Sequence, residues 1–220
     1  MKDDIRKRIE AIGIVPAVRL SSAADALFAA EAVSSGGIPI VEVTLTVPGA
    51  VDFIHEMTRN HPEIIVGAGT IVDVKMAKIC LQAGASFLTS PSLDLDISAF
   101  AHGKDVVYFP GALTPTEIMA AYKAGCDFVK VFPCSHVGGA SYVRTLRAPF
   151  PALPLIASGG VNQQTAADFI LAGASVLGVG RDLIQPEAIH RRDRSWIVEL
   201  ARRFMTMVAD ARAKKAEESH

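Results

Sequence analysis

The chain has 220 residues, of which 50% are hydrophobic and 6% are aromatic, and its formal net charge at pH 7 is -1. A chain of this length can bury a core of Ala, Val, Ile and Leu that needs neither disulfides nor metals for its stability. The balanced charge excludes a strongly basic or acidic protein, so we expect neither a nucleic acid nor a membrane as a partner.

Short apolar, β-branched segments alternate along the chain with Ala-rich segments of helical periodicity. Strands are predicted at 14–18, 40–45, 64–68, 86–89, 106–109, 128–132, 155–158 and 176–179. Helices are predicted at 1–12, 23–34, 51–60, 74–82, 115–123, 164–171 and 191–213, followed by a charged tail that we expect to be frayed. Gly138 and Gly139 form either a flexible loop or a turn.

Eight strands that alternate with helices favour a closed (β/α)8 barrel, the TIM barrel, in a single α/β domain. A doubly wound open sheet is the alternative, but it rarely uses eight such regular units. We expect the barrel at about 13–185, an extra helix before it, and a C-terminal helix and tail at about 191–220.

Cysteine usage and the start of the chain predict a cytoplasmic protein. The three cysteines form no CxxC pair, and an odd count is typical of a reduced chain. The first residues are charged and no apolar segment follows them, so we expect no signal peptide. No apolar run reaches the ~18 residues that a membrane span needs.

Three predicted strands carry an ionisable residue near their C-terminal ends, although a covered parallel strand should be apolar throughout. Arg19 ends the first strand, Glu42 lies in the second and Lys130 in the sixth. Alone, each has an ordinary explanation as a loop residue, an ion-pair partner or an edge residue. Because a barrel builds its functional site from several strand ends at one face, a single site explains all three.

Side-chain alternation places Lys130 on one face with Phe128 and Phe132, and Glu42 on one face with Thr44. If Lys130 points into the barrel, the two rings help to keep water from its amine. Desolvation lowers the pKa of a lysine, which frees the amine as a nucleophile. A partly buried carboxylate such as Glu42 is suited to proton transfer.

Glycines follow the seventh and eighth predicted strands, where barrels often bind a phosphate. Gly159 and Gly160 follow Ser158, and Gly180 precedes Arg181. Backbone N–H groups beside glycines can approach an anion closely, although tight turns alone would also explain the glycines. The six histidines show no metal-binding spacing, so we expect no metal and an amine-based mechanism.

The order of these motifs resembles the 2-keto-3-deoxy-6-phosphogluconate (KDPG) aldolase and 4-hydroxy-2-oxoglutarate (KHG) aldolase family over roughly residues 10–185. The matching segments are Val-Glu-Val-Thr-Leu-Thr at 41–46, Val-Gly-Ala-Gly-Thr at 66–70, Ser-Pro at 90–91, Pro-Gly at 110–111, Thr-Pro-Thr-Glu at 114–117, Val-Lys-Val-Phe-Pro at 129–133 and Gly-Gly-Val at 159–161. The resemblance implies a class I aldolase, a lyase that cleaves a 2-oxo-4-hydroxy acid to pyruvate and an aldehyde without a cofactor.

The resemblance implies that Lys130 forms the Schiff base and that Glu42 is the general acid and base. The substrate-binding residues that we expect are Arg19, Thr44, Thr70, Pro91, Phe132, Ser158, Gly159, Gly160, Gly180 and Arg181. The family usually forms trimers, so a homotrimer that binds a small 2-oxo acid is implied.

Two positions depart from the family pattern. Thr46 stands where many members have an Arg for the substrate carboxylate, a role that Arg19 can assume. Arg181 stands where a Ser is common, and its planar guanidinium can strengthen phosphate binding or block the pocket. Two alternatives therefore stay open: a phosphate-binding barrel isomerase or epimerase, in which Lys130 is not covalent, and a non-catalytic trimeric scaffold.

Overall fold

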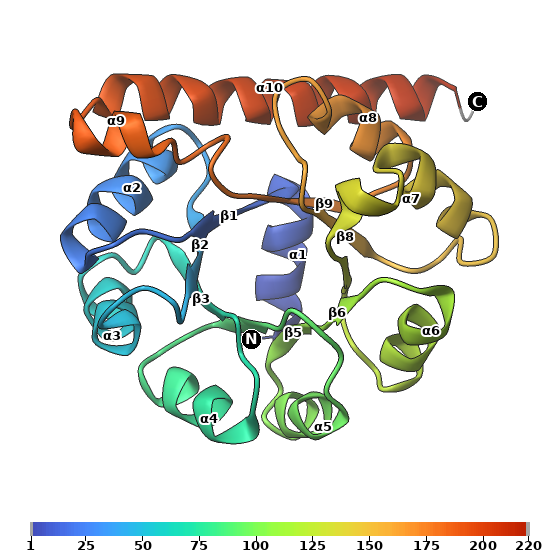
Figure 1. Ribbon diagram of the computed structural model, residues 1–220, viewed down its shortest axis with the longest axis horizontal. Coiled ribbons are helices and arrows are strands. Elements are labelled where there is room, and N and C mark those ends of the chain that lie inside the picture. The colour runs from blue at the N-terminus through green and yellow to red at the C-terminus, as the bar shows by residue number, and fades with distance from the viewer. Residues whose placement is uncertain (1, 219–220) are drawn as a thin grey trace.

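The computed structural model describes residues 2–218, so Met1 of the predicted first helix and Ser219 and His220 of the predicted tail lie outside the described residues. Its strands form one parallel sheet in the order β5-β4-β3-β2-β1-β9-β8-β7-β6. The sheet curls into a nearly closed barrel with most of the helices on its outside (Figure 1). The predicted (β/α)8 architecture is confirmed.

The strands lie close to their predicted positions. They are β1 (Ile14–Val18), β2 (Ile40–Thr44), β3 (Ile65–Gly69), β4 (Phe87–Thr89), β5 (Val107–Phe109), β6 (Gly111–Ala112), β7 (Val129–Val131), β8 (Leu155–Ser158) and β9 (Val176–Val179). The bounds of β1, β8 and β9 agree with the prediction, and the other predicted strands differ by one residue at one or both ends. Only β6 was not predicted.

The additional strand β6 results from an interruption of the fifth barrel strand at Pro110. β5 pairs with β4, whereas β6 pairs with β7 in a register that sets Gly111 beside Lys130. Proline has no backbone N–H, so the hydrogen-bond ladder breaks at this residue. Its carbonyl still accepts a hydrogen bond of 2.9 Å from the backbone N–H of Lys130. Together β5 and β6 occupy one barrel position, and the barrel closes beside the strand that carries Lys130.

The helices are α1 (Lys2–Ile12), α2 (Ala23–Ser35), α3 (Ala50–Asn60), α4 (Val74–Gln82), α5 (Leu95–Gly103), α6 (Pro115–Lys123), α7 (Ala140–Arg147), α8 (Ala166–Leu171), α9 (Pro186–His190) and α10 (Arg194–Glu217), with a 3-10 turn, η1 (Cys134–Val137). Sequence reasoning did not find α5, α7, α9 or η1. The two short elements, α9 and η1, give no periodicity to detect. Gly139 is the residue before α7, so the Gly138-Gly139 pair is a turn between η1 and that helix.

The expectation of a frayed charged tail is wrong, because α10 continues to Glu217. Alanine and long straight side chains favour helix in this segment. Arg212 also fixes the helix to the start of the barrel, since its guanidinium donates 2.6 Å hydrogen bonds to the carbonyls of Glu10 and Ala11. Figure 1 shows α10 running along one side of the barrel, across α2, α8 and α9. None of the helices within residues 2–218 has the length and apolar character needed to cross a membrane.

The core has two parts, one between the strands and the outer helices and one inside the barrel. Phe87, Phe109 and Phe128 fill the interior, with ring centroids 5.2 and 5.1 Å apart. Ile9 of α1 is fully buried against this interior group, and Figure 1 shows α1 within the ring of strands. Because α1 closes the N-terminal end of the barrel, the C-terminal strand ends are left for a site.

Candidate active site

Lys130 of β7 and Glu42 of β2 meet inside the barrel although 88 residues separate them in the sequence. The Lys130 Nζ atom lies 3.5 Å from Glu42 Oε2, and the two side chains are 13% and 7% exposed. Burying either charge without a partner would cost free energy. The opposite charge of the other side chain offsets this cost. The structure therefore brings together two of the three ionisable strand residues as one buried pair.

Glycines in β3 make room for this arrangement. β2 and β3 pair with Glu42 beside Gly67 and Thr44 beside Gly69. A Cβ atom on Gly69 would lie 2.2 Å from Glu42 Oε1, and one on Gly67 would lie 2.2 Å from the ring of Phe87. The Gly-Ala-Gly sequence of β3 thus accommodates the carboxylate with one glycine and the aromatic floor of the barrel with the other.

An aromatic ring lies beside the Lys130 amine, on the face that side-chain alternation predicted. Phe128 is fully buried in the barrel interior. The centroid of the Phe132 ring lies 5.8 Å from Nζ, a distance at which a cation and an aromatic face attract each other. The Phe132 ring therefore lies on one side of the amine.

Sequence reasoning missed Thr89, the last residue of β4, which also contacts the amine. Its Oγ1 atom lies 3.3 Å from Lys130 Nζ, and the residue is fully buried. Its signal in the sequence is a hydroxyl two residues after Phe87, on the inward face at a strand end. That signal is weak, since threonine is common in strands and carries no charge.

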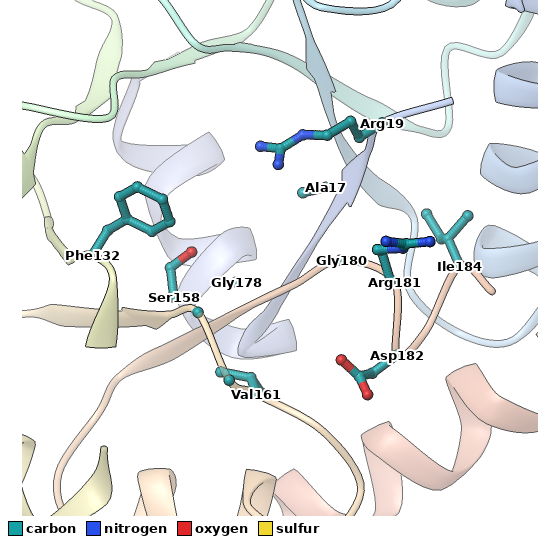
Figure 2. A pocket seen from close by; sticks show the side chains of 12 residues that line it. Ala17, Arg19, Phe132, Ser158, Val161, Gly178, Gly180, Arg181, Asp182 and Ile184 are labelled. Carbon is teal, nitrogen blue, oxygen red and sulfur yellow. The ribbon is translucent and has the colours of Figure 1, made fainter. Parts of the chain in front are cut away.

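A cavity of about 240 Å³ opens beside this group at the C-terminal ends of β1, β8 and β9 and beyond the end of β7 (Figure 2). Its lining includes the predicted residues Arg19, Phe132, Ser158, Gly159, Gly160, Gly180 and Arg181. It also includes Ala17, Val161, Gly178, Asp182 and Ile184, which were not predicted. Lys130 and Glu42 do not line the cavity, and Phe132 links it to them.

Three predicted substrate-binding residues also lie outside the lining of this cavity. Thr44 is buried, and its hydroxyl donates to the carbonyl of Val18 at 3.1 Å and lies 2.8 Å from that of Thr46. Thr70 follows β3 with a φ of 64°, a left-handed conformation that is unusual for a β-branched residue. Pro91 is exposed after β4. All three lie at or just beyond the C-terminal ends of strands.

The loop after β8 has a backbone conformation that favours glycine. Gly159 and Gly160 have φ values of +92° and +78°, which side chains rarely tolerate. The Gly159 carbonyl accepts a 3.1 Å hydrogen bond from the N–H of Ser135, which fixes the loop to η1. Within residues 2–218 the N–H groups of Gly160 and Val161 donate to no other protein group, so both are available to a ligand.

Two arginines supply positive charge around the cavity. Figure 2 shows the Arg19 side chain extending across the cavity toward Phe132, and Arg181 beside Ile184 at a greater distance from Phe132. In the described part of the chain neither guanidinium forms a hydrogen bond or an ion pair. Free guanidinium groups at a cavity favour carboxylate or phosphate ligands. The carboxylate of Asp182 makes the outer part of the cavity less positive.

Cys134, four residues after Lys130 in the sequence, is a further nucleophile by residue type. Its thiol is buried, and desolvation raises its pKa to about 11. The thiolate is the reactive form of cysteine, so this thiol is inert at neutral pH. Among residues 2–218 there is no group of three or more His, Cys, Asp and Glu side chains that could hold a metal ion.

Comparison with known proteins gives a consistent result. A sequence profile of the family described as KDPG and KHG aldolase matches residues 5–200. The 2-dehydro-3-deoxy-phosphogluconate aldolase of Pseudomonas aeruginosa is 31% identical over 200 residues, 90% of each chain. The KHG/KDPG aldolase of Escherichia coli K12 is 32% identical over 190 residues, 86% of this chain and 89% of the relative.

Two solved structures extend the comparison to bound ligands. The KDPG aldolase of Legionella pneumophila, with pyruvate captured as a covalent carbinolamine intermediate, has a TM-score of 0.84 and 27% identity, and the match covers 90% of this chain and 96% of that one. The enzyme of Zymomonas mobilis with 3-phosphoglycerate has a TM-score of 0.82 and 26% identity, and the match covers 94% and 97%.

Proposed function

Because this chain belongs to the KDPG and KHG aldolase family, we propose that it is a class I aldolase that cleaves KDPG, or a related 2-oxo-4-hydroxy acid, to pyruvate and an aldehyde. The observation that carries the proposal is the buried Lys130–Glu42 pair at the C-terminal end of the barrel. No feature of the site favours an isomerase, an epimerase or a non-catalytic scaffold over this reaction.

The reaction begins at Lys130. In its neutral form the amine attacks the C2 carbonyl of the substrate, and loss of water from the carbinolamine gives an iminium ion between Nζ and C2. The positive iminium nitrogen withdraws electrons from C3 and acts as the electron sink, so the chemistry requires no cofactor.

Glu42 then moves the protons. Its carboxylate, acting through a water molecule, takes the proton of the C4 hydroxyl, and the C3–C4 bond breaks with its electrons passing to the iminium. The aldehyde leaves, and an enamine of pyruvate remains on Lys130. Protonation of the enamine at C3 and attack of water on C2 release pyruvate and restore the free amine.

The cavity holds the rest of the substrate. Arg19, which extends toward Phe132, binds the carboxylate next to C2. It takes the role of the arginine that many family members have at the position of Thr46. Arg181 and the free N–H groups of Gly160 and Val161 bind a distal phosphate, a role supported by the phosphoglycerate in the Zymomonas mobilis structure. Ser158 and Gly180 complete this wall of the cavity.

Thr44, Thr70 and Pro91 surround the pyruvyl group in this proposal. We further propose a homotrimer that works in the cytoplasm, for which family resemblance is the support. Light scattering after size-exclusion chromatography tests the trimer.

Reductive trapping tests the chemistry. The protein is incubated with pyruvate and sodium borohydride, its intact mass is measured, and the modified peptide is mapped. We expect a reduced pyruvyl adduct on Lys130 and none in a Lys130→Met variant. A folded protein that forms no adduct, or one modified at another lysine, would refute the Schiff-base assignment.

A further inference from the structure

The Lys130 amine lies between two oxygen atoms, and the mechanism above uses only one of them. Nζ is 3.3 Å from Thr89 Oγ1 and 3.5 Å from Glu42 Oε2. Both oxygens belong to fully or almost fully buried residues, so bulk water does not compete for the amine on these two sides. The hydroxyl of Thr89 is the nearer of the two partners.

The position of the Thr89 hydroxyl is fixed by the strand that carries it. Thr89 follows Phe87 on the inward face of β4 and pairs with Phe109 of β5, so its side chain points into the barrel. Its carbonyl accepts a 3.0 Å hydrogen bond from the N–H of Ile71. The next residue, Ser90, donates its N–H to the carbonyl of Phe109 at 3.1 Å. A group held on a rigid strand end in this way keeps its geometry during a reaction.

Two hydrogen-bond acceptors are what a nucleophilic amine requires. A neutral primary amine has two N–H bonds and one lone pair. If Thr89 and Glu42 each accept one N–H, the lone pair is left pointing away from both, and it can attack C2. With only one acceptor the amine can rotate about its Cε–Nζ bond, and the lone pair has no fixed direction.

The iminium stage separates the roles of the two oxygens. The nitrogen then carries a single hydrogen, and one acceptor must hold it. A carboxylate bound to the iminium N–H would be a weaker base for the proton of the C4 hydroxyl. A neutral hydroxyl can accept this hydrogen bond and leave the carboxylate free.

We propose that Thr89 is a positioning residue for Lys130, which accepts one N–H of the amine and later the N–H of the iminium, so that Glu42 stays free to move protons. The inference rests on the proposed function. The covalent chemistry is that given above. Thr89 forms no covalent bond with the substrate and keeps its own hydroxyl proton throughout.

The test compares imine formation in Thr89→Val and Thr89→Ser with the wild type. Valine keeps the shape of threonine and lacks the hydroxyl, whereas serine keeps the hydroxyl. Rapid mixing with pyruvate and quenching with borohydride gives the rate of adduct formation on Lys130. Exchange of the pyruvate methyl protons in D2O, followed by NMR, gives the rate of enamine formation. We expect valine to slow both rates about 10- to 100-fold, as for a lost hydrogen bond to a charged group, and serine to restore them to within about threefold.

Controls keep the outcomes distinct. Thermal melting reports whether each variant is folded. If Thr89→Val does not fold, Thr89→Ser and Thr89→Ala form the matched pair, because both lack the methyl group and only serine has the hydroxyl. A wild-type protein without an adduct overturns the proposed function and this inference together. A wild-type adduct with equal rates in the hydroxyl-bearing and hydroxyl-free variants overturns this inference alone.

Discussion

Replacement of Gly69 by alanine is expected to displace the Glu42 carboxylate and abolish most of the cleavage activity. The added Cβ would lie 2.2 Å from Glu42 Oε1, 2.6 Å from Cδ and 2.7 Å from Cγ. Ordinary contact begins near 3.4 Å, so the carboxylate must move by about 1 Å. The 3.5 Å contact between Glu42 Oε2 and Lys130 Nζ would then be lost. A displacement of this size in a reacting group costs on the order of 100-fold in kcat.

The matched control is Gly103→Ala at the end of α5, where an added Cβ meets nothing within 4 Å. Pyruvate release from KDPG is followed in both variants, and thermal melting measures the stability lost by overpacking at Gly69, which is about 1–3 kcal/mol. Because Lys130 keeps its place, Gly69→Ala should still form a borohydride-trapped adduct with pyruvate. Wild-type kcat in a folded Gly69→Ala protein would refute the assignment of proton transfer to Glu42.

Two further predictions concern the cavity and the barrel exterior. Arg181→Ser should raise KM for a phosphorylated substrate about tenfold and leave the rate of pyruvate methyl exchange unchanged. Arg19→Met should slow the methyl exchange. If the two variants had equal effects in both assays, the assignment of Arg181 to the phosphate end and of Arg19 to the carboxylate end would be contradicted. Glu117 accepts hydrogen bonds from the N–H groups of Thr114 and Leu113, which lower its pKa from 4.5, so it stabilises the fold above that value and loses this contribution as pH falls through the folded pKa. Glu117→Gln should therefore lower the melting temperature at pH 7 but much less at pH 3, and a difference independent of pH would show that the charge is not the cause.

Sequence reasoning succeeded where a local pattern determined the structure. The alternation of apolar and Ala-rich segments predicted the barrel, because each βα unit has its own periodicity. Strand parity placed Lys130 on the same face as Phe128, which lies in the barrel interior. The convergence of Glu42 with Lys130 followed from a general property of barrels, whose strand ends meet at one face.

The missed residues depend on distances between strands that no local pattern contains. Thr89 contacts Lys130 only because β4 and β7 stand at a particular separation across the barrel interior. Asp182 and Ile184 belong to an irregular segment after β9, where neither helical nor strand periodicity gives a side-chain direction. A proline after an apolar run is a local signal for the break at Pro110. The short strand after it forms by pairing with β7, which no local pattern indicates.

α1 closes the N-terminal end of the barrel with Ile9, so molecules can enter and leave the site only at the C-terminal end. Substrate and products share one mouth. In the proposed reaction the pyruvyl half is attached at the inner end, and the aldehyde half occupies the outer cavity. Because the pyruvyl half stays covalently bound to Lys130 until its hydrolysis, the aldehyde leaves first and pyruvate leaves last. In the synthetic direction the order reverses, and pyruvate has to enter before any aldehyde can block its path.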